Sequence, residues 1–154
     1  MTDSRLDILA EMAYEAGYLK QVDYLSEYDD DCDNFISAII LTFEHGIYTI
    51  LAIAEDDTIE VLSGACYPAI EYHLFSVTGK EPWSGAVDKK IIFTWDSVNQ
   101  QGYADSIQFY FNNVDSEKYG KEEPVIIQLT TIASSLKTYK VEQIKYEFRR
   151  RERS

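Results

Sequence analysis

The clearest pattern in the chain is a pair of alternating apolar runs between residues 91 and 112. Six large apolar residues fall on one side of the two extended segments: Ile91, Phe93, Trp95, Ile107, Phe109 and Phe111. Residues 99–102, Asn-Gln-Gln-Gly, separate the runs and tolerate the positive φ of a hairpin connection. We therefore predict a long antiparallel hairpin that buries this apolar side.

A second alternating region, residues 35–62, predicts a meander of three strands. Its first run, residues 36–43, is apolar on both sides, so we expect that part of the sheet to be covered on both faces. Residues 6–16 carry apolar side chains at helical spacing and end near Gly17. This spacing predicts an N-terminal helix that covers one of those faces.

The remaining segments have weaker patterns. Residues 20–28 alternate loosely and fit a strand or an extension of the helix. Residues 63–87 have no clean period and indicate a long irregular connection with one short helix; the alternative is a helix packed on the sheet. Residues 124–133 predict a strand, and residues 136–148 fit a strand or a strand followed by a helix. Together the patterns predict one α+β domain over residues 1–154, with the N-terminal helix packed on a curved, mainly antiparallel sheet of about six to eight strands.

The charge of the chain narrows the range of partners. Its net charge is −13, and residues 1–136 hold 7 basic against 24 acidic residues, while residues 137–154 hold 7 against 3. An acidic surface disfavours nucleic acid and favours a basic partner. The basic C-terminal tail, about residues 149–154, either folds onto the acidic body or stays solvated; a binding arm is the alternative.

Several classes of site have no support in the sequence. Cys32 and Cys66 make no disulfide framework, and no Cys/His spacing indicates zinc. There is no signal-peptide pattern and no apolar stretch of about 18 residues, so we expect a cytoplasmic protein that does not enter a membrane. Phosphate-loop, nucleophile-elbow and HExxH motifs are absent, so we assign no catalytic residue, metal or cofactor.

The first candidate binding segment is acidic and consists of Asp29, Asp30, Asp31 and Asp33. It opens like a calcium loop, but Asn34 stands where that loop needs glycine and Ile40 where it needs glutamate. A solvated turn is the simpler interpretation. The alternative is that these residues, with Asp23 and Glu27, present a negative patch to a basic protein.

The second candidate is the hairpin turn, whose polar and aromatic residues are Trp95, Asn99, Gln100, Gln101, Tyr103 and Asp105. The structural interpretation is that the amides satisfy backbone groups of the turn and that Trp95 belongs to the core. The alternative interpretation is a recognition surface, because aromatic and amide groups make adaptable contacts at protein interfaces.

Asp56 and Asp57 lie between two predicted strands, where aspartate commonly caps a tight turn. If they approached Asp105 or Asp96 in space, they would form an acid/base or metal-binding pair. Nothing in the sequence shows whether these carboxylates converge.

Three segments together resemble a small bacterial family of unknown function with D-D-T and N-Q-Q-G-Y-x-D signatures: residues 55–59, 95–105 and 132–136. The resemblance spans most of the chain and implies no activity. In size, charge and composition the chain is also similar to bacterial immunity proteins and antitoxin-like inhibitors.

We therefore expect a non-enzymatic protein-interaction module, immunity- or inhibitor-like, that binds a basic partner. The alternative is a small-molecule or metal-dependent enzyme that uses Asp56, Asp57 and Asp105. The sequence leaves the partner and the oligomeric state open.

Overall fold

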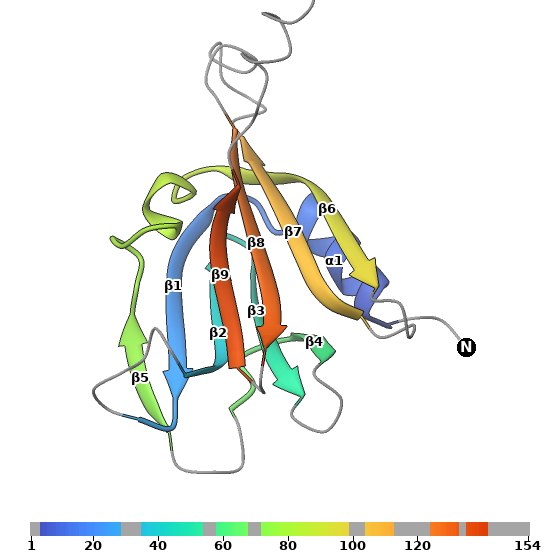
Figure 1. Ribbon diagram of the computed structural model, residues 1–154. Helices are drawn as coiled ribbons and strands as arrows, with labels where there is room; N and C mark the ends of the chain where they lie inside the picture. The colour runs from blue at the N-terminus through green and yellow to red at the C-terminus, as the bar shows by residue number, and fades with distance from the viewer. Residues whose placement is uncertain are drawn as a thin grey trace, which may run out of the picture.

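The computed structural model describes residues 4–28, 35–53, 58–67, 72–98, 104–112, 124–132 and 135–141 (Figure 1). Its elements in chain order are α1 (Ser4–Tyr14), β1 (Leu19–Ser26), β2 (Ile36–Phe43), β3 (Gly46–Ile53), β4 (Thr58–Ser63), β5 (His73–Ser76), the 3-10 helix η1 (Trp83–Gly85), β6 (Lys90–Val98), β7 (Ala104–Asn112), β8 (Val125–Ile132) and β9 (Ser135–Val141). The predicted α+β architecture, one N-terminal helix on a curled antiparallel sheet, is confirmed in this part of the chain.

The sheet is one curled surface rather than two separate layers. Its main path runs β4-β3-β2-β9-β8-β7-β6, and β1 pairs with β2 and with β5. Every pairing between the described strands is antiparallel. The path forks at the start of β2, where Ile36 pairs with Leu136 of β9 while β3 pairs from Ala38 onward. At this fork β9 pairs with β2 only through Ile36, whereas β3 pairs with Ala38–Phe43 and β1 runs along the whole of β2 (Figure 1).

Helix α1 lies inside the curl and closes it. Leu9, Met12 and Ala16 are buried in the main core, and the helix packs chiefly against β6 and β4, the two ends of the sheet path (Figure 1). The predicted helix is therefore confirmed, but its place differs: within the meander it contacts chiefly β4 rather than a face of β2. Gly17 follows the helix with a φ of 81°.

The three main strand predictions hold. The meander is β2–β3–β4, the hairpin is β6–β7, and residues 20–28 form a strand, β1, rather than an extension of α1. Residues 63–87 contain the short helix η1 and also β5, which we did not predict. β5 has four residues and only Phe75 is even half-buried, so it carries no apolar alternation to detect. Residues 136–141 belong to a strand, and the alternative helix at 142–148 lies outside the described residues.

The hairpin differs from its prediction in one respect. Ile91 pairs with Phe111, but Phe93 pairs with Tyr110, so the register shifts by one residue at a β-bulge. A one-residue shift exchanges the two faces of a strand. Ile91 is therefore buried, whereas Phe93 and Trp95 are 52% and 48% exposed and the prediction that they lie in the core is wrong.

The aromatic centre of the core comes instead from the segment before β6. Trp83 has no exposed surface, and its Nε1 donates a hydrogen bond of 2.7 Å to the Tyr24 hydroxyl. The Tyr24 hydroxyl also lies 3.2 Å from Thr138 Oγ1. This contact chain joins β1 to β9 through side chains near the fork in the sheet.

Candidate functional site

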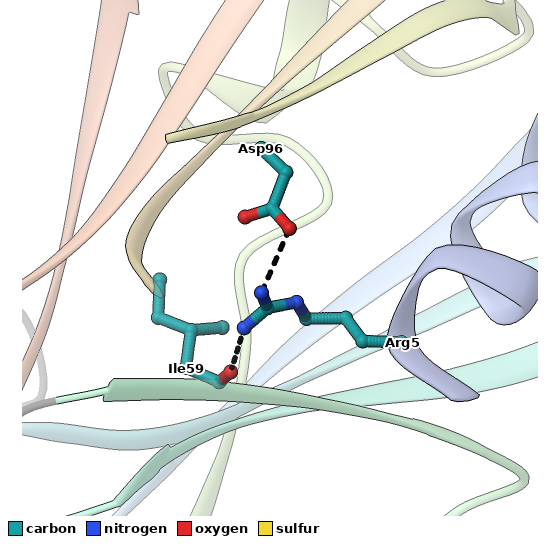
Figure 2. Close-up of polar contacts among 3 residues, drawn as sticks. All are labelled: Arg5, Ile59 and Asp96. Atoms are coloured by element: carbon teal, nitrogen blue, oxygen red, sulfur yellow. Dashed lines mark hydrogen bonds and ion pairs between the residues drawn. The ribbon is translucent and has the colours of Figure 1, made fainter. Parts of the chain in front are cut away.

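Arg5 is the residue that fixes the orientation of helix α1. Its guanidinium donates one hydrogen bond to the backbone carbonyl of Ile59 at 3.0 Å and another to the Asp96 carboxylate at 2.8 Å (Figure 2). Ile59 belongs to β4 and Asp96 to β6, so a single side chain connects both ends of the sheet. The bulge makes this contact possible, because it turns Asp96 toward the helix while Phe93 and Trp95 turn away.

Anchoring by Arg5 and the buried residues leaves the opposite side of α1 in solvent. This outer face of α1 has an apolar row, Leu6, Ala10 and Tyr14, and next to it an acidic row, Asp7, Glu11 and Glu15, in which Asp7 and Glu15 are exposed and Glu11 is half-buried. Each row repeats every four residues, which places its members on one side of a helix. Tyr14 is 86% exposed and Leu6 is 52% exposed, large values for apolar side chains on a helix that packs on a sheet.

The acidic row is electrostatically unfavourable for the isolated helix. Like charges four residues apart repel each other, and Glu11 and Glu15 lie near the helix C-terminus, where the backbone dipole disfavours negative charge. The last turn contains no basic residue to offset them. The pKa of the nearby Tyr48 hydroxyl is raised, first by burial and then by the charges of Glu11 and Glu15 and a hydrogen bond to Glu11. A cation placed against this face would relieve the repulsion.

A second exposed surface lies on the outer side of the β6–β7 hairpin, opposite α1. We call Phe93, Trp95 and Tyr110 the aromatic face; their ring centroids are 5.4–6.3 Å apart. Beside it, Gln108 Nε2 donates to Gln128 Oε1 at 2.8 Å. This surface joins aromatic and amide groups, as the recognition interpretation of Trp95 requires.

The structure places only part of the predicted candidate set. Trp95 lies in the aromatic face, and Asp105 is half-buried at the start of β7. The other members lie outside the described residues: Asn99, Gln100, Gln101, Tyr103, Asp29, Asp30, Asp31, Asp33, Asp56 and Asp57. Asp23 is buried and accepts a hydrogen bond from Gln21 at 2.8 Å, so it contributes little to a negative surface patch.

The convergence of Asp56, Asp57 and Asp105 therefore stays a prediction. Asp96, the other carboxylate considered with them, is paired with Arg5 in a partly buried ion pair. Among the described residues, no three His, Cys, Asp or Glu side chains are grouped closely enough to hold a metal ion. In that same part of the chain, no helix has the length and apolar character needed to cross a membrane.

We did not select Arg5 or the outer face of α1 from the sequence, although a signal for Arg5 was present. Arg5, Leu9, Met12 and Ala16 share one helical face, so a cation begins an otherwise apolar row. A charge in such a position calls for a buried partner. The exposure of Tyr14 had no comparable signal, because tyrosine is common on both buried and exposed helix faces.

A family model described as a family of unknown function, DUF6334, matches residues 1–145. The chain belongs to this family, which confirms the expected membership in a family without an assigned activity. The match does not test the two signature motifs. Neither the curated proteins nor the solved structures that were compared gave a match.

Proposed function

For this member of a family without an assigned activity, we propose a non-enzymatic, cytoplasmic interaction module that binds a basic protein. We infer that the outer face of α1 is its contact surface. The partner would receive Leu6 and Tyr14 in an apolar groove and place lysine or arginine side chains against Asp7, Glu11 and Glu15. This arrangement is the helix-in-groove mode of recognition, with charge providing the specificity.

One observation carries the proposal: an exposed apolar row and a repulsive acidic row lie side by side on the same helix. The acidic row costs the free helix a few tenths of a kcal/mol per pair, roughly 0.2–0.5. The apolar surfaces of Leu6 and Tyr14 stay in contact with water, so they contribute no free energy of burial. A basic partner converts both costs into favourable contacts.

The test is a capture experiment with matched charge reversals. The tagged chain, an Asp7→Lys/Glu15→Lys variant and a Glu27→Lys/Glu60→Lys control are incubated with lysate of the source cells at low and high salt. All four substituted residues are exposed, and the two variants change the net charge equally. Captured proteins are identified by mass spectrometry, and the candidate partner is then purified and titrated against each variant by calorimetry.

We expect a basic protein that binds the wild type and the control and is lost from the α1 variant. Its affinity should fall as salt rises, since the Debye length shortens from about 30 Å at 0.01 M to about 8 Å at 0.15 M. Equal losses in both variants would show nonspecific attraction to an acidic chain and would overturn the assignment to α1.

We propose in addition that Trp95 takes part in binding through the aromatic face. The same calorimetric titration with Trp95→Ala measures this contribution separately, because Trp95 and the outer face of α1 lie on different sides of the hairpin. An unchanged affinity would remove Trp95 from the interface and leave the α1 proposal intact.

A further inference from the structure

The three rings of the aromatic face are inclined to one another rather than coplanar. Tyr110 stands at 71° to Phe93 and at 70° to Trp95, with ring centroids 5.4 Å and 6.3 Å apart. In an edge-to-face arrangement of this kind, the faces of two rings meet at a corner. Phe93 and Trp95 are exposed and Tyr110 is half-buried, so part of these ring faces is open to solvent. The surface therefore consists of aromatic corners and not of a flat platform.

The pairing of β6 with β7 holds the rings in these positions. Phe93 lies directly opposite Tyr110, and Trp95, which lies opposite Gln108, is the diagonal neighbour of Tyr110. Gln108 donates its side-chain hydrogen bond to Gln128 on β8, so the row of side chains beside the rings is also tied across strands. A ligand meets a surface that is already ordered, which reduces the entropy lost on binding.

The distribution of charge indicates the class of ligand. Strands β6 to β9 contain two carboxylates, Asp96 and Asp105. Asp96 binds Arg5 on the opposite side of the hairpin, and Asp105 alternates with the buried Ile107, so neither belongs to the aromatic face. The face of an aromatic ring is the negative part of its quadrupole, and the whole molecule carries a charge of −13. A cation is therefore attracted to the molecule and, at this surface, contacts rings rather than a carboxylate.

We propose that the aromatic face binds an arginine side chain of the basic protein partner, an inference that rests on the proposed function. Arginine is the cation that most often stacks on aromatic rings, because its guanidinium group is planar and weakly hydrated. A compact cation fits a corner, since it can contact two ring faces at once. A broad flat ligand would need coplanar rings instead.

The experiment follows the indole N–H signals of Trp83 and Trp95 in the ¹⁵N-labelled chain by NMR. Hexa-arginine, hexa-lysine and hexa-citrulline are titrated separately at low salt; the citrulline side chain has the shape of arginine without its charge. We expect hexa-arginine to shift the Trp95 signal until it saturates, hexa-lysine to shift it less and hexa-citrulline to leave it in place. The Trp83 signal should stay unchanged in all titrations, because its ring is fully buried.

Substitutions separate a cation–π contact from an apolar one. Trp95→Leu keeps an apolar side chain but removes the ring, and it should weaken the binding of hexa-arginine, measured by calorimetry, about two- to fivefold, as expected for a cation–π contact at an exposed site. Trp95→Phe keeps a ring and should weaken binding less. Tyr67→Leu is the matched control and should bind like wild type, because Tyr67 is about as exposed as Trp95 but stacks on Tyr72 at 5° and forms no corner.

The inference is overturned if hexa-arginine leaves the Trp95 signal in place, or if hexa-citrulline shifts it equally. Wild-type affinity in Trp95→Leu, or an equal loss in Tyr67→Leu, would overturn it as well, and an equal response to hexa-lysine would overturn the choice of arginine. These results leave the outer face of α1 untouched, because its charge-reversal variants are tested with the captured partner. Conversely, a partner that still binds Asp7→Lys/Glu15→Lys would remove α1 from the interface without affecting the response of Trp95 to hexa-arginine.

Discussion

Trp83 and Trp95 occupy opposite environments. Trp83 is fully buried and hydrogen-bonded to Tyr24, while Trp95 stands half-exposed beside Phe93 and Tyr110. The difference comes from the backbone rather than from the side chains, because the bulge after Ile91 sets which face Trp95 joins.

This contrast gives a prediction for stability. Trp83→Ala removes a buried ring and leaves the Tyr24 hydroxyl short of a donor, so it should lower the free energy of unfolding by about 3–5 kcal/mol. Trp95→Ala removes a half-exposed ring and should cost about 1 kcal/mol or less. Urea denaturation of the two variants against wild type measures both values. Similar losses would mean that Trp95 is part of the core.

A second residue-scale prediction concerns alkaline pH. Burial, and then the charges of Glu11 and Glu15, raise the pKa of Tyr48 above its ordinary value of 10.0. The folded state therefore keeps the Tyr48 proton at a pH where the unfolded state has lost it, and this contribution to stability disappears as the pH rises from 10 through the folded-state pKa. Wild type should lose more stability than Tyr48→Phe over that interval, as thermal melts at increasing pH would show. Parallel losses would exclude Tyr48 as a cause.

At the scale of elements, α1 connects β4 and β6, two strands that do not pair with each other along the sheet path. β4 and β6 end that path, and the hydrogen bonds of Arg5 reach both (Figure 2). Here the helix covers the opening that the curl leaves, so its anchoring affects the ends of the sheet directly.

Arg5→Met tests how much the connection of α1 to β4 and β6 contributes to stability. It leaves Asp96 partly buried without its cation, and we expect a loss of about 3 kcal/mol in the free energy of unfolding. Arg5→Met/Asp96→Leu removes both charges and should recover part of that loss, because an apolar pair tolerates burial. Lys20→Met, which breaks the exposed pair with Asp88, is the control and should leave the denaturation midpoint unchanged. A double variant no more stable than Arg5→Met would contradict this account.

Gly17 limits the same element at its C-terminal end. Its φ of 81° is strained for other residues, and a Cβ there would lie 2.7 Å from Glu44 Oε1, which accepts a hydrogen bond from the Tyr18 N–H. Gly17→Ala should therefore destabilise the chain by about 1–2 kcal/mol, measurable as a lower melting temperature. An unchanged melting temperature would show that the Glu44 side chain can move aside at no cost.

The sequence predicted which segments form helices and strands better than it predicted which face of each strand is buried. Two-residue and helical periods identified α1, the meander and the β6–β7 hairpin because the apolar residues of each element recur at a regular spacing. The bulge near Ile92 adds one residue without changing the period on either side of it, so periodicity could not show that Phe93 and Trp95 change face. Arg5 and Asp96 lie far apart in sequence: the helical pattern could show that Arg5 needs a partner, but not that Asp96 is that partner.

At the scale of the whole molecule, the charge of −13 is a stability term as well as a basis for binding. Like charges repel across a compact chain, and salt screens that repulsion. We predict that the melting temperature rises between about 10 mM and about 300 mM sodium chloride. The rise should be smaller for Asp7→Lys/Glu15→Lys, which changes the net charge by four units, from −13 to −9. A melting temperature that falls with salt would show that attractive pairs outweigh the repulsion.

The position of α1 also determines when the molecule can finish folding. The helix precedes the described strands in the chain, but its 11 residues are too few for a stable helix in isolation, since helices shorter than about 12–15 residues are marginal in water. The groups that Arg5 binds follow 54 and 91 residues later in the chain. We therefore expect α1 to reach its final position late, and the molecule to fold slowly, as is usual for chains dominated by long-range strand pairing.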